Sequence, residues 1–257
     1  MYFGVKKPNR ELSVGEILGQ SFSLYFTRFA HFYVIFLLAG LVRSGFGQIV
    51  IALLPLQPVP EFTWSSEEIM KQFSEWFPPF VATLILILAL TFIVTWIINM
   101  IANGVAVKYT SDLLEKGNAR LQDELEFIIS RLHRLLSAGV ITSILTFISL
   151  FLLVIPGIIL MIIFALVVQT IVIERVGVLE SLGRSRKLLS GRWGKTFVIF
   201  LFIGIMILLV GVVGVIANQI AGFFIPTGWI IGSFIMAFIF PVFPIAMTFL
   251  YYSMVAR

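Results

Sequence analysis

The chain has 257 residues, of which 60% are apolar and 12% are charged, and it contains no cysteine. A soluble domain carries about 25% charged residues, because its surface must be hydrated. This composition excludes a soluble enzyme, a soluble nucleic-acid-binding protein and a disordered tail, and the absence of cysteine excludes disulfides and thiolate-ligated metals. We therefore expect an all-α integral membrane protein. The formal net charge of +5 takes its meaning from where the basic residues lie.

Apolar stretches long enough to cross a bilayer recur six times along the chain. A hydrocarbon core about 30 Å thick requires roughly 20 apolar residues per helix. Pro156 and Gly157 divide one run that is too long for a single span, and they predict a turn there. Pro241 and Pro244 predict a kink in the last span. The predicted spans are about Ala30–Leu54, Pro79–Val107, Ala138–Ile155, Ile158–Ile173, Thr196–Ala217 and Gly228–Val255.

Basic residues gather on one side of these spans. All but two of the 18 lysines and arginines precede the first span, lie in the second–third or fourth–fifth connection, or end the chain. The exceptions are Arg43, inside a span, and Lys71, which lies among glutamates in the first connection. The positive-inside rule then predicts a multi-pass protein of the cell membrane with both termini cytoplasmic. No secretory signal is expected, because the first apolar segment is too long.

Three cytoplasmic segments, each preceding an odd-numbered span, have the period of an amphipathic helix. Such helices lie in the headgroup plane, although they could instead pack on the bundle as connectors. A further short helix, with Ile69, Phe73, Trp76 and Phe77, is predicted on the outer interface. The apolar faces comprise Val14, Leu18, Phe22, Tyr25 and Phe29 in the first segment; Leu121, Leu125, Ile128, Ile129, Leu132, Leu135 and Leu136 in the second; and Val178, Leu182 and Leu189 in the third.

The first segment is repeated near the middle of the second half of the chain. A shift of 164 residues places Glu16 on Glu180 and Arg28 on Arg192, and 12 of the 27 positions that begin at Val14 are identical. The middle segment shares the pattern with little identity. We therefore expect a single integral membrane domain, 1–257, built from three parallel repeats of an interfacial amphipathic helix plus a transmembrane hairpin. The repeat units are about 11–116, 119–175 and 176–257.

Arg43 is the one ionisable residue near the middle of a predicted span, where function is the default expectation. It could form a polar pocket for an anionic headgroup or an amphiphile. Alternatively, it is structural and bonded to side-chain amides and free carbonyls; if it is functional, Arg43→Leu should leave folding largely intact. The candidate intramembrane polar site comprises Arg43, Gln48, Thr95, Asn99, Asn103 and Gln169.

Basic residues before the fifth span are candidates for binding anionic headgroups, each contributing about 1 kcal/mol near the surface. Glu174 is expected to form a local ion pair with its neighbour Arg175. His31 and His133 are too few and too far apart for a metal site, so neither a metal nor another cofactor is expected. The candidate headgroup-binding residues are Arg184, Arg186, Lys187 and Arg192.

Three stretches carry a family resemblance. They are the run Ile155–Ile159, the run Val172–Ser185 followed by Leu188, Gly191 and Trp193, and the run Leu12–Leu18. Together they resemble the glycerophosphoryl diester phosphodiesterase membrane-domain family and related uncharacterised six-span membrane proteins. In that family the membrane domain can precede a soluble phosphodiesterase. This chain stops at Arg257, just after the last predicted span, so no such catalytic domain is expected and the resemblance implies no enzymatic activity.

Two functions remain in competition. The first is a non-enzymatic membrane module that binds lipids or acts as a scaffold, with anionic headgroups on the cytoplasmic side as partners and no nucleic acid. The alternative is a transporter or channel for an amphiphilic or anionic small molecule. An intramembrane enzyme is disfavoured, because no catalytic set of acid, histidine and nucleophile appears in the spans.

Overall fold

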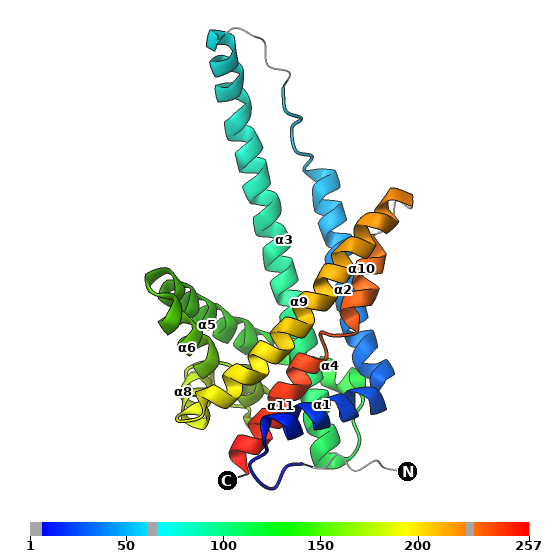
Figure 1. Cartoon of the computed structure of the whole chain (residues 1–257), viewed down its shortest axis with the longest axis vertical. Coiled ribbons are helices and arrows are strands. Elements are labelled where there is room, and N and C mark those ends of the chain that lie inside the picture. The colour runs from blue at the N-terminus through cyan, green and yellow to red at the C-terminus, as the bar shows by residue number, and fades with distance from the viewer. Residues whose placement is uncertain (1–6, 61–65, 225–228, 257) are drawn as a thin grey trace. The chain divides into compact units, whose positions relative to one another are not determined.

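The computed structural model describes residues 7–60, 66–224 and 229–256, and within these ranges the regular structure is entirely helical (Figure 1). Leu153 interrupts one helical run and residues 238–241 interrupt another. The helices are α1 (Val14–Thr27), α2 (Phe29–Leu53), α3 (Ser66–Lys116), α4 (Leu121–Ser130), α5 (Leu132–Leu152), α6 (Val154–Ile163), α7 (Val167–Gln169), the π-helix η1 (Thr170–Glu174), α8 (Val178–Leu189), α9 (Trp193–Phe224), α10 (Trp229–Ala237) and α11 (Val242–Val255).

Six helical stretches of the described chain are long and apolar enough to cross a membrane. They agree with the six predicted spans, so the expectation of an all-α, multi-pass membrane protein is confirmed at this level. The stretches are Phe29–Leu53, Glu68–Lys116, Leu132–Ser149, Ile155–Glu174, Trp193–Phe224 and Trp229–Val255.

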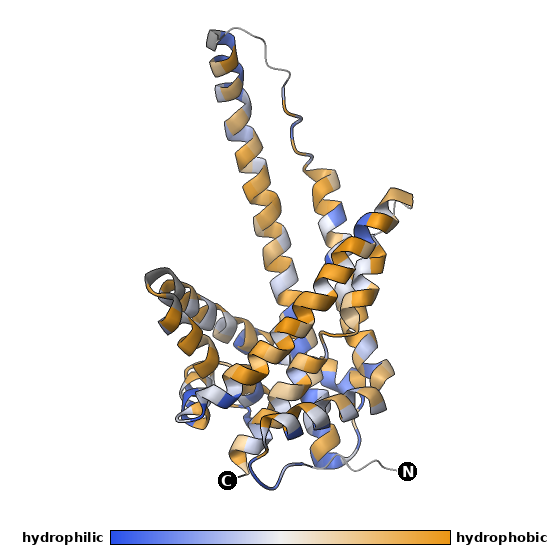
Figure 2. Ribbon diagram, in the orientation of Figure 1, coloured by the Kyte–Doolittle hydropathy of each residue, from blue (hydrophilic) through white to orange (hydrophobic). Residues whose placement is uncertain are grey.

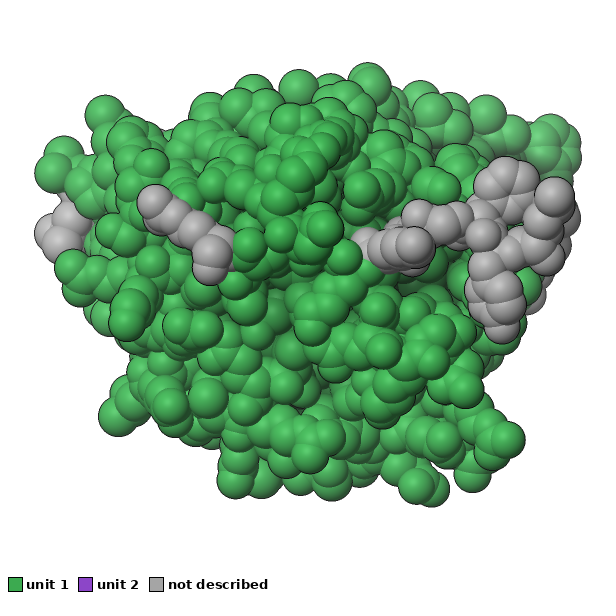
Figure 3. All heavy atoms as spheres, turned by 90° about the horizontal axis from the view of Figure 1, so that it is seen from below, with its two compact units in different colours: residues 1–40, 99–257 green, residues 41–98 purple. Residues whose placement is uncertain are grey.

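The chain forms two compact units. The larger unit comprises residues 1–40 and 99–257, and the smaller comprises residues 41–98. The larger unit makes up the face that is seen in Figure 3. The predicted single domain, 1–257, stays a prediction.

Much of the surface of α9 is apolar, as its nearly continuous orange colour in Figure 2 shows. Leu208, Phe223 and Phe224 are each more than 60% exposed on this helix. A soluble monomer rarely exposes contiguous apolar area beyond a few hundred Å², because water solvates it poorly. Lipid is the solvent that such a surface fits.

Helix α11 forms the centre of the larger unit. From Val242 to Met254 it is buried at every position except Phe243. A helix that is apolar all round is stable only when protein or lipid surrounds it. Here the surroundings include α1, α8 and α9, so the α11 part of the last span is enclosed by protein.

The apolar face of α1 also turns to this core. Ile17, Leu24 and Tyr25 are buried in the cluster that contains α11. A capping box begins the helix: the Ser13 hydroxyl accepts the N–H of Glu16, and the Glu16 carboxylate accepts the N–H of Ser13. Of the two alternatives for the amphipathic segments, packing on the bundle describes α1.

The chain turns three residues before Pro156, which corrects the turn predicted at Pro156–Gly157. Leu153 is extended (φ −157°, ψ 128°), and α6 begins at Val154. Pro156 lies in the first turn of α6, where a backbone N–H has no helical partner, so the proline costs nothing there. The predicted kink in the last span is confirmed as the break between α10 and α11, and Pro241 precedes α11.

Two further element boundaries differ from expectation. The short outer helix around Phe73 is the beginning of α3, which continues through Pro78 and Pro79. Proline φ is helical, so a proline does not by itself end a helix. The second amphipathic segment is not one helix, because it bends at Arg131 (φ −112°, ψ 7°), between α4 and α5.

Candidate functional site

A buried ion network lies where α3 meets α4 in the larger unit. The ammonium group of Lys108 is bonded to the Asp112 carboxylate and lies 3.4 Å from the Glu124 carboxylate. The side chains of Lys108 and Asp112 are 9% exposed, and that of Glu124 is 4% exposed. Charges this deep are stable only when they are paired, because burial removes their hydration.

Local sequence brings these groups together. Lys108, Asp112 and Lys116 are spaced four residues apart and therefore share one face of α3. The Lys116 ammonium group lies 2.9 Å from the Asp112 carboxylate. Gly117 then adopts φ +75°, a conformation that glycine enters readily, and the chain reverses towards α4. The first turn of α4 carries Glu124 back over the end of α3.

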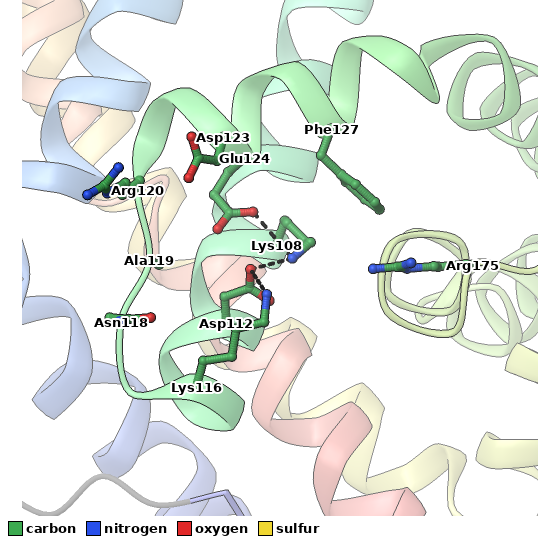
Figure 4. Close-up of a pocket in the computed structure, with 10 residues that line it drawn as sticks. All are labelled: Lys108, Asp112, Lys116, Asn118, Ala119, Arg120, Asp123, Glu124, Phe127 and Arg175. Atoms are coloured by element: carbon green, nitrogen blue, oxygen red, sulfur yellow. Dashed lines mark hydrogen bonds and ion pairs between the residues drawn. The ribbon is translucent and has the colours of Figure 1, made fainter.

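A cavity of about 490 Å³ opens beside this network (Figure 4). Its walls come from the end of α3, the connection to α4, α4 itself and the residue after η1. In Figure 4 the Arg175 side chain extends towards the network from the side opposite α3. The lining residues are Lys108, Asp112, Lys116, Asn118, Ala119, Arg120, Asp123, Glu124, Phe127 and Arg175.

The aromatic ring of Phe127 is a meeting point for cations. Its centroid lies 5.1 Å from the Lys108 ammonium nitrogen, 4.9 Å from the Arg131 guanidinium carbon and 5.5 Å from the Arg175 guanidinium carbon. Each contact is within cation–π range. One ring is therefore the shared neighbour of three positive groups from three parts of the fold.

Arg175 has a strained backbone. It follows the π-helix η1 and has φ +62° and ψ 23°, the left-handed region that L-residues other than asparagine and aspartate seldom enter. Among the described residues it is the one non-glycine residue with positive φ. Strain of this kind costs about 1–3 kcal/mol and clusters at functional sites, as π-helical turns do.

The electrostatics of the cavity favour an anion. Burial, followed by the hydrogen bond that joins Glu124 to Asp112, raises the pKa of Glu124 to about 7. Lys108 and Lys116 are neutralised by the network, whereas no ion pair joins Arg120 or Arg175 to a carboxylate of the described residues. The cavity can therefore attract a negatively charged group to its arginines.

Sequence reasoning missed this network, although a signal was present. Glu124 lies next to the apolar arc of the second amphipathic segment at 100° per residue, where a carboxylate is out of place. An acid in that position predicts a buried partner. The partner, Lys108, lies at the beginning of the same predicted connection, where its charge is explained equally well by the positive-inside rule.

The predicted headgroup residues divide into two pairs. Arg184 is bonded to both oxygens of Glu174 through Nε, at 2.9 Å each, and Arg192 lies 2.9 Å from Glu11. The two remaining residues, Arg186 and Lys187, are exposed. Arg184 and Arg192 are thus held in ion pairs, and headgroup binding by Arg186 and Lys187 stays a prediction.

The expected ion pair between Glu174 and Arg175 is wrong. The Glu174 carboxylate pairs with Arg184 and accepts a hydrogen bond from the Tyr251 hydroxyl at 2.9 Å. Adjacent residues diverge here, because the left-handed backbone of Arg175 turns its side chain to the Phe127 ring.

The predicted intramembrane polar residues fall in different units. Arg43, Gln48 and Thr95 belong to residues 41–98, and Asn99, Asn103 and Gln169 belong to the larger unit. The Asn103 amide donates to the Asn99 carbonyl oxygen at 2.8 Å. Gln169 is 3% exposed, and its Oε1 has no hydrogen-bond partner among the described residues. A shared site for these residues stays a prediction.

The described residues contain no group of three or more histidine, aspartate or glutamate side chains placed to hold a metal ion. Comparison with family models, with characterised proteins and with solved structures gave no significant match.

Proposed function

We propose that this protein is a non-enzymatic integral membrane module that binds anionic lipid headgroups at the cytoplasmic face of the cell membrane. The observation that carries the proposal is the exposed face of α8. Leu179 is 76% exposed there, and Arg186 and Lys187 are exposed about two turns further along the helix. Apolar and basic side chains exposed together on one helix are typical of contact with an anionic lipid surface.

Cytoplasmic placement of this face follows from the distribution of lysine and arginine. The predicted connection between the fourth and fifth spans holds six basic residues, whereas the predicted connection between the first and second spans has one lysine among glutamates. Under the positive-inside rule, both termini then lie in the cytoplasm. Nucleic acid is not part of the proposal, because a lipid headgroup supplies the counter-charge.

Three parallel repeats form the second part of the proposal, and helix boundaries support it. With the shift of 164 residues, the first residue of α1 coincides with that of α8, and the first residue of α2 with that of α9. The buried positions also correspond under this shift. Ile17 and Ser21 of α1 are as fully buried as Ser181 and Ser185, which correspond to them in α8.

An arginine at each bend supports the same arrangement. Arg28 separates α1 from α2, Arg131 separates α4 from α5, and Arg192 precedes α9. Each unit then consists of an amphipathic helix, a bend with arginine and a long apolar helix. Membership of the glycerophosphoryl diester phosphodiesterase membrane-domain family, suggested by the resemblance in sequence, stays part of the proposal. The six apolar stretches fit that family, and the resemblance assigns no catalytic residue to this chain.

A transporter or channel is the second candidate, and one observation favours it. Two of the membrane-long stretches are discontinuous: residues 164–166 interrupt the stretch between α6 and α7, and residues 238–241 interrupt that between α10 and α11. Helices α7 and α11 are in contact, and buried Gln169 lies on α7. Broken helices around a polar group are typical of transporter binding sites.

Lipid retention tests the first candidate. The purified protein is delipidated in detergent, mixed with phosphatidylglycerol or phosphatidylcholine, and the bound lipid is measured by native mass spectrometry. We expect preferential retention of phosphatidylglycerol and its loss in the double variant Arg186→Gln/Lys187→Gln. Lys71→Gln, an exposed lysine on the other predicted side, is the control and should retain the lipid. Equal retention of both lipids by the unmodified protein would contradict the proposal.

Flux measurements test the second candidate. The protein is reconstituted in vesicles loaded with carboxyfluorescein, an anionic small molecule, and release is followed against protein-free vesicles. Protein-dependent release that falls in Gln169→Leu would favour transport over headgroup binding.

A further inference from the structure

We propose that the cavity between α3, α4 and Arg175 is a phosphate-binding site, in which Arg175 holds the phosphate oxygens beside the ring of Phe127. Arg131 is not among the residues that line the cavity, but its guanidinium group contacts the same ring and adds positive charge beside the site. The proposal specifies the headgroup chemistry of the function proposed above. It rests on that function only for the source of the phosphate, which could be a lipid headgroup or a free phosphate.

The first argument is an unmet donor. Arg131 Nη1 is buried and has no hydrogen-bond partner among the described residues. Leaving a charged donor without a partner costs more than leaving a neutral one, so such groups are ordinarily satisfied by protein, water or ligand. An anion acceptor next to Arg131 would remove this cost.

The second argument is the convergence of like charges. Burial, and then the charges of Arg134 and Arg175, lower the pKa of Arg131. Three arginines that repel one another in the same region are unfavourable unless an anion lies among them. The left-handed backbone of Arg175 is what brings the third guanidinium into this region.

The third argument is the match between these donors and phosphate. A guanidinium group presents a planar fork of N–H donors that bonds two phosphate oxygens at once. A phosphate monoester carries about −1.5 to −2 charges at pH 7, which suits two or three unneutralised arginines. The neighbouring acids Asp112 and Glu124 are already engaged with Lys108, and Lys116 adds a further bond to Asp112.

The volume of the site is sufficient for more than an ion. A cavity of about 490 Å³ lies within the range of small-molecule sites and would accept a phosphate with part of its substituent. Asp123 and Asn118 line the same space and could contact polar atoms of that substituent. Phe127 provides a flat apolar wall.

The test uses the full-length protein in detergent, with two probes. Inorganic phosphate is titrated at constant ionic strength, with chloride as the reference, and thermal unfolding is recorded. In parallel, retention of phosphatidic acid and of phosphatidylcholine is measured by native mass spectrometry. We expect phosphate or phosphatidic acid, or both, to bind and to raise the unfolding temperature.

Variants locate the binding. Arg175→Gln should weaken binding about tenfold or more, because it removes charged hydrogen bonds to the phosphate. Arg131→Gln should weaken binding less, because it removes a positive charge beside the site and not a residue that lines it. Arg175→Lys keeps the positive charge but loses the planar pair of N–H donors, so its affinity for phosphate should lie between those of the glutamine variant and the unmodified protein. Lys71→Gln, an exposed cation outside the cavity and outside the proposed headgroup face, is the control and should bind the phosphate probe like the unmodified protein. Unfolding temperatures without ligand identify any variant that has lost its fold.

The two probes distinguish a free phosphate from a lipid headgroup, and they separate the phosphate site from the general headgroup proposal. Binding of inorganic phosphate assigns the site to the phosphate group itself, and binding of phosphatidic acid alone assigns it to a lipid headgroup. Failure of both probes to bind, or equal binding by the unmodified protein and both glutamine variants, overturns the phosphate site. Phosphatidylglycerol retention that depends on Arg186 and Lys187 would then still support the general headgroup proposal. Phosphate binding that depends on Arg175, in a protein without that retention, would support the phosphate site alone.

Discussion

The hydroxyl of Ser185 lies 2.6 Å from the carbonyl oxygen of Ile163, to which it donates a hydrogen bond. The hydroxyl oxygen of Ser185 in turn accepts a hydrogen bond from the backbone N–H of Leu166 at 3.2 Å. Ile163 ends α6, and Leu166 precedes α7, so one serine of α8 bonds to the backbone on both sides of a break in a membrane-long stretch. Irregular backbone at membrane depth is stable only when protein satisfies its polar groups.

Ser185→Ala should therefore destabilise the protein by about 1–3 kcal/mol, because it leaves two buried backbone groups unsatisfied. Ser21→Ala is the matched control. Ser21 is equally buried, but its hydroxyl bonds to the Ile17 carbonyl of its own helix, so its loss should cost less than about 1 kcal/mol. Thermal unfolding in detergent measures both variants, and equal losses would contradict the role of Ser185 at the break.

Glu124→Gln should change how stability depends on pH. The pKa of Glu124 is raised by burial from an ordinary 4.5 to about 7, so between these values the folded protein holds a proton that the unfolded chain releases. Stability should decline as the pH rises through this window and level off above it. Glutamine cannot titrate, so the variant should lose that part of the decline.

Unfolding temperatures at intervals between pH 4.5 and pH 8 measure this effect. The groups that face Glu124 are Lys108 and Asp112, and Lys116 bonds to Asp112. They remain in the variant and serve as the constant background. The same slope in both proteins would show that Glu124 does not titrate in this range.

Lys108→Met should cost about 3–5 kcal/mol, because it leaves the buried carboxylates of Asp112 and Glu124 without their shared cation. The double variant Lys108→Met/Glu124→Gln should recover part of this loss, since one of the two carboxylates is then neutral. Lys116→Met is the control. Its side chain is 58% exposed, so it should cost about 1 kcal/mol or less. Urea or thermal unfolding compares the three, and a small loss for Lys108→Met would refute the network.

Gln169→Leu tests whether the role of Gln169 is structural or functional. Its buried Oε1 has no partner among the described residues, so the substitution should cost less than about 1 kcal/mol of stability. If broken helices form a transport pathway around it, carboxyfluorescein release should fall while the unfolding temperature is retained. A large loss of stability would instead mean that the amide group is structural.

The predictions made from sequence succeeded for spans and failed for partners. Six spans and the kink near Pro241 follow from hydropathy and proline, which act over a few neighbouring residues. The turn near Pro156 was misplaced by three residues, because a proline is also tolerated in the first turn of a helix. The continuous α3 was missed for a related reason, since proline does not end every helix.

Charge partners could not be assigned from sequence, since they depend on contacts between distant segments. Glu174 was matched with its neighbour Arg175, but the backbone conformation of Arg175 separates the two side chains and leaves Arg184 as the partner of Glu174. Leu12 and Ser253 show the same dependence at larger separation: the N–H of Leu12 donates to the Ser253 hydroxyl at 2.7 Å, although 241 residues separate them.

Composition and residue order by themselves determined that the chain is a helical, multi-pass membrane protein, and they predict which side its basic residues face. These properties follow from hydrophobic length and charge placement, which can be added up along the chain without knowing its fold. Only the tertiary structure decided that Lys108, Asp112 and Glu124 form a buried network beside a cavity, with Arg175 turned towards it. The free energy of such a group depends on which distant charges replace its water, and that is set when the helices pack.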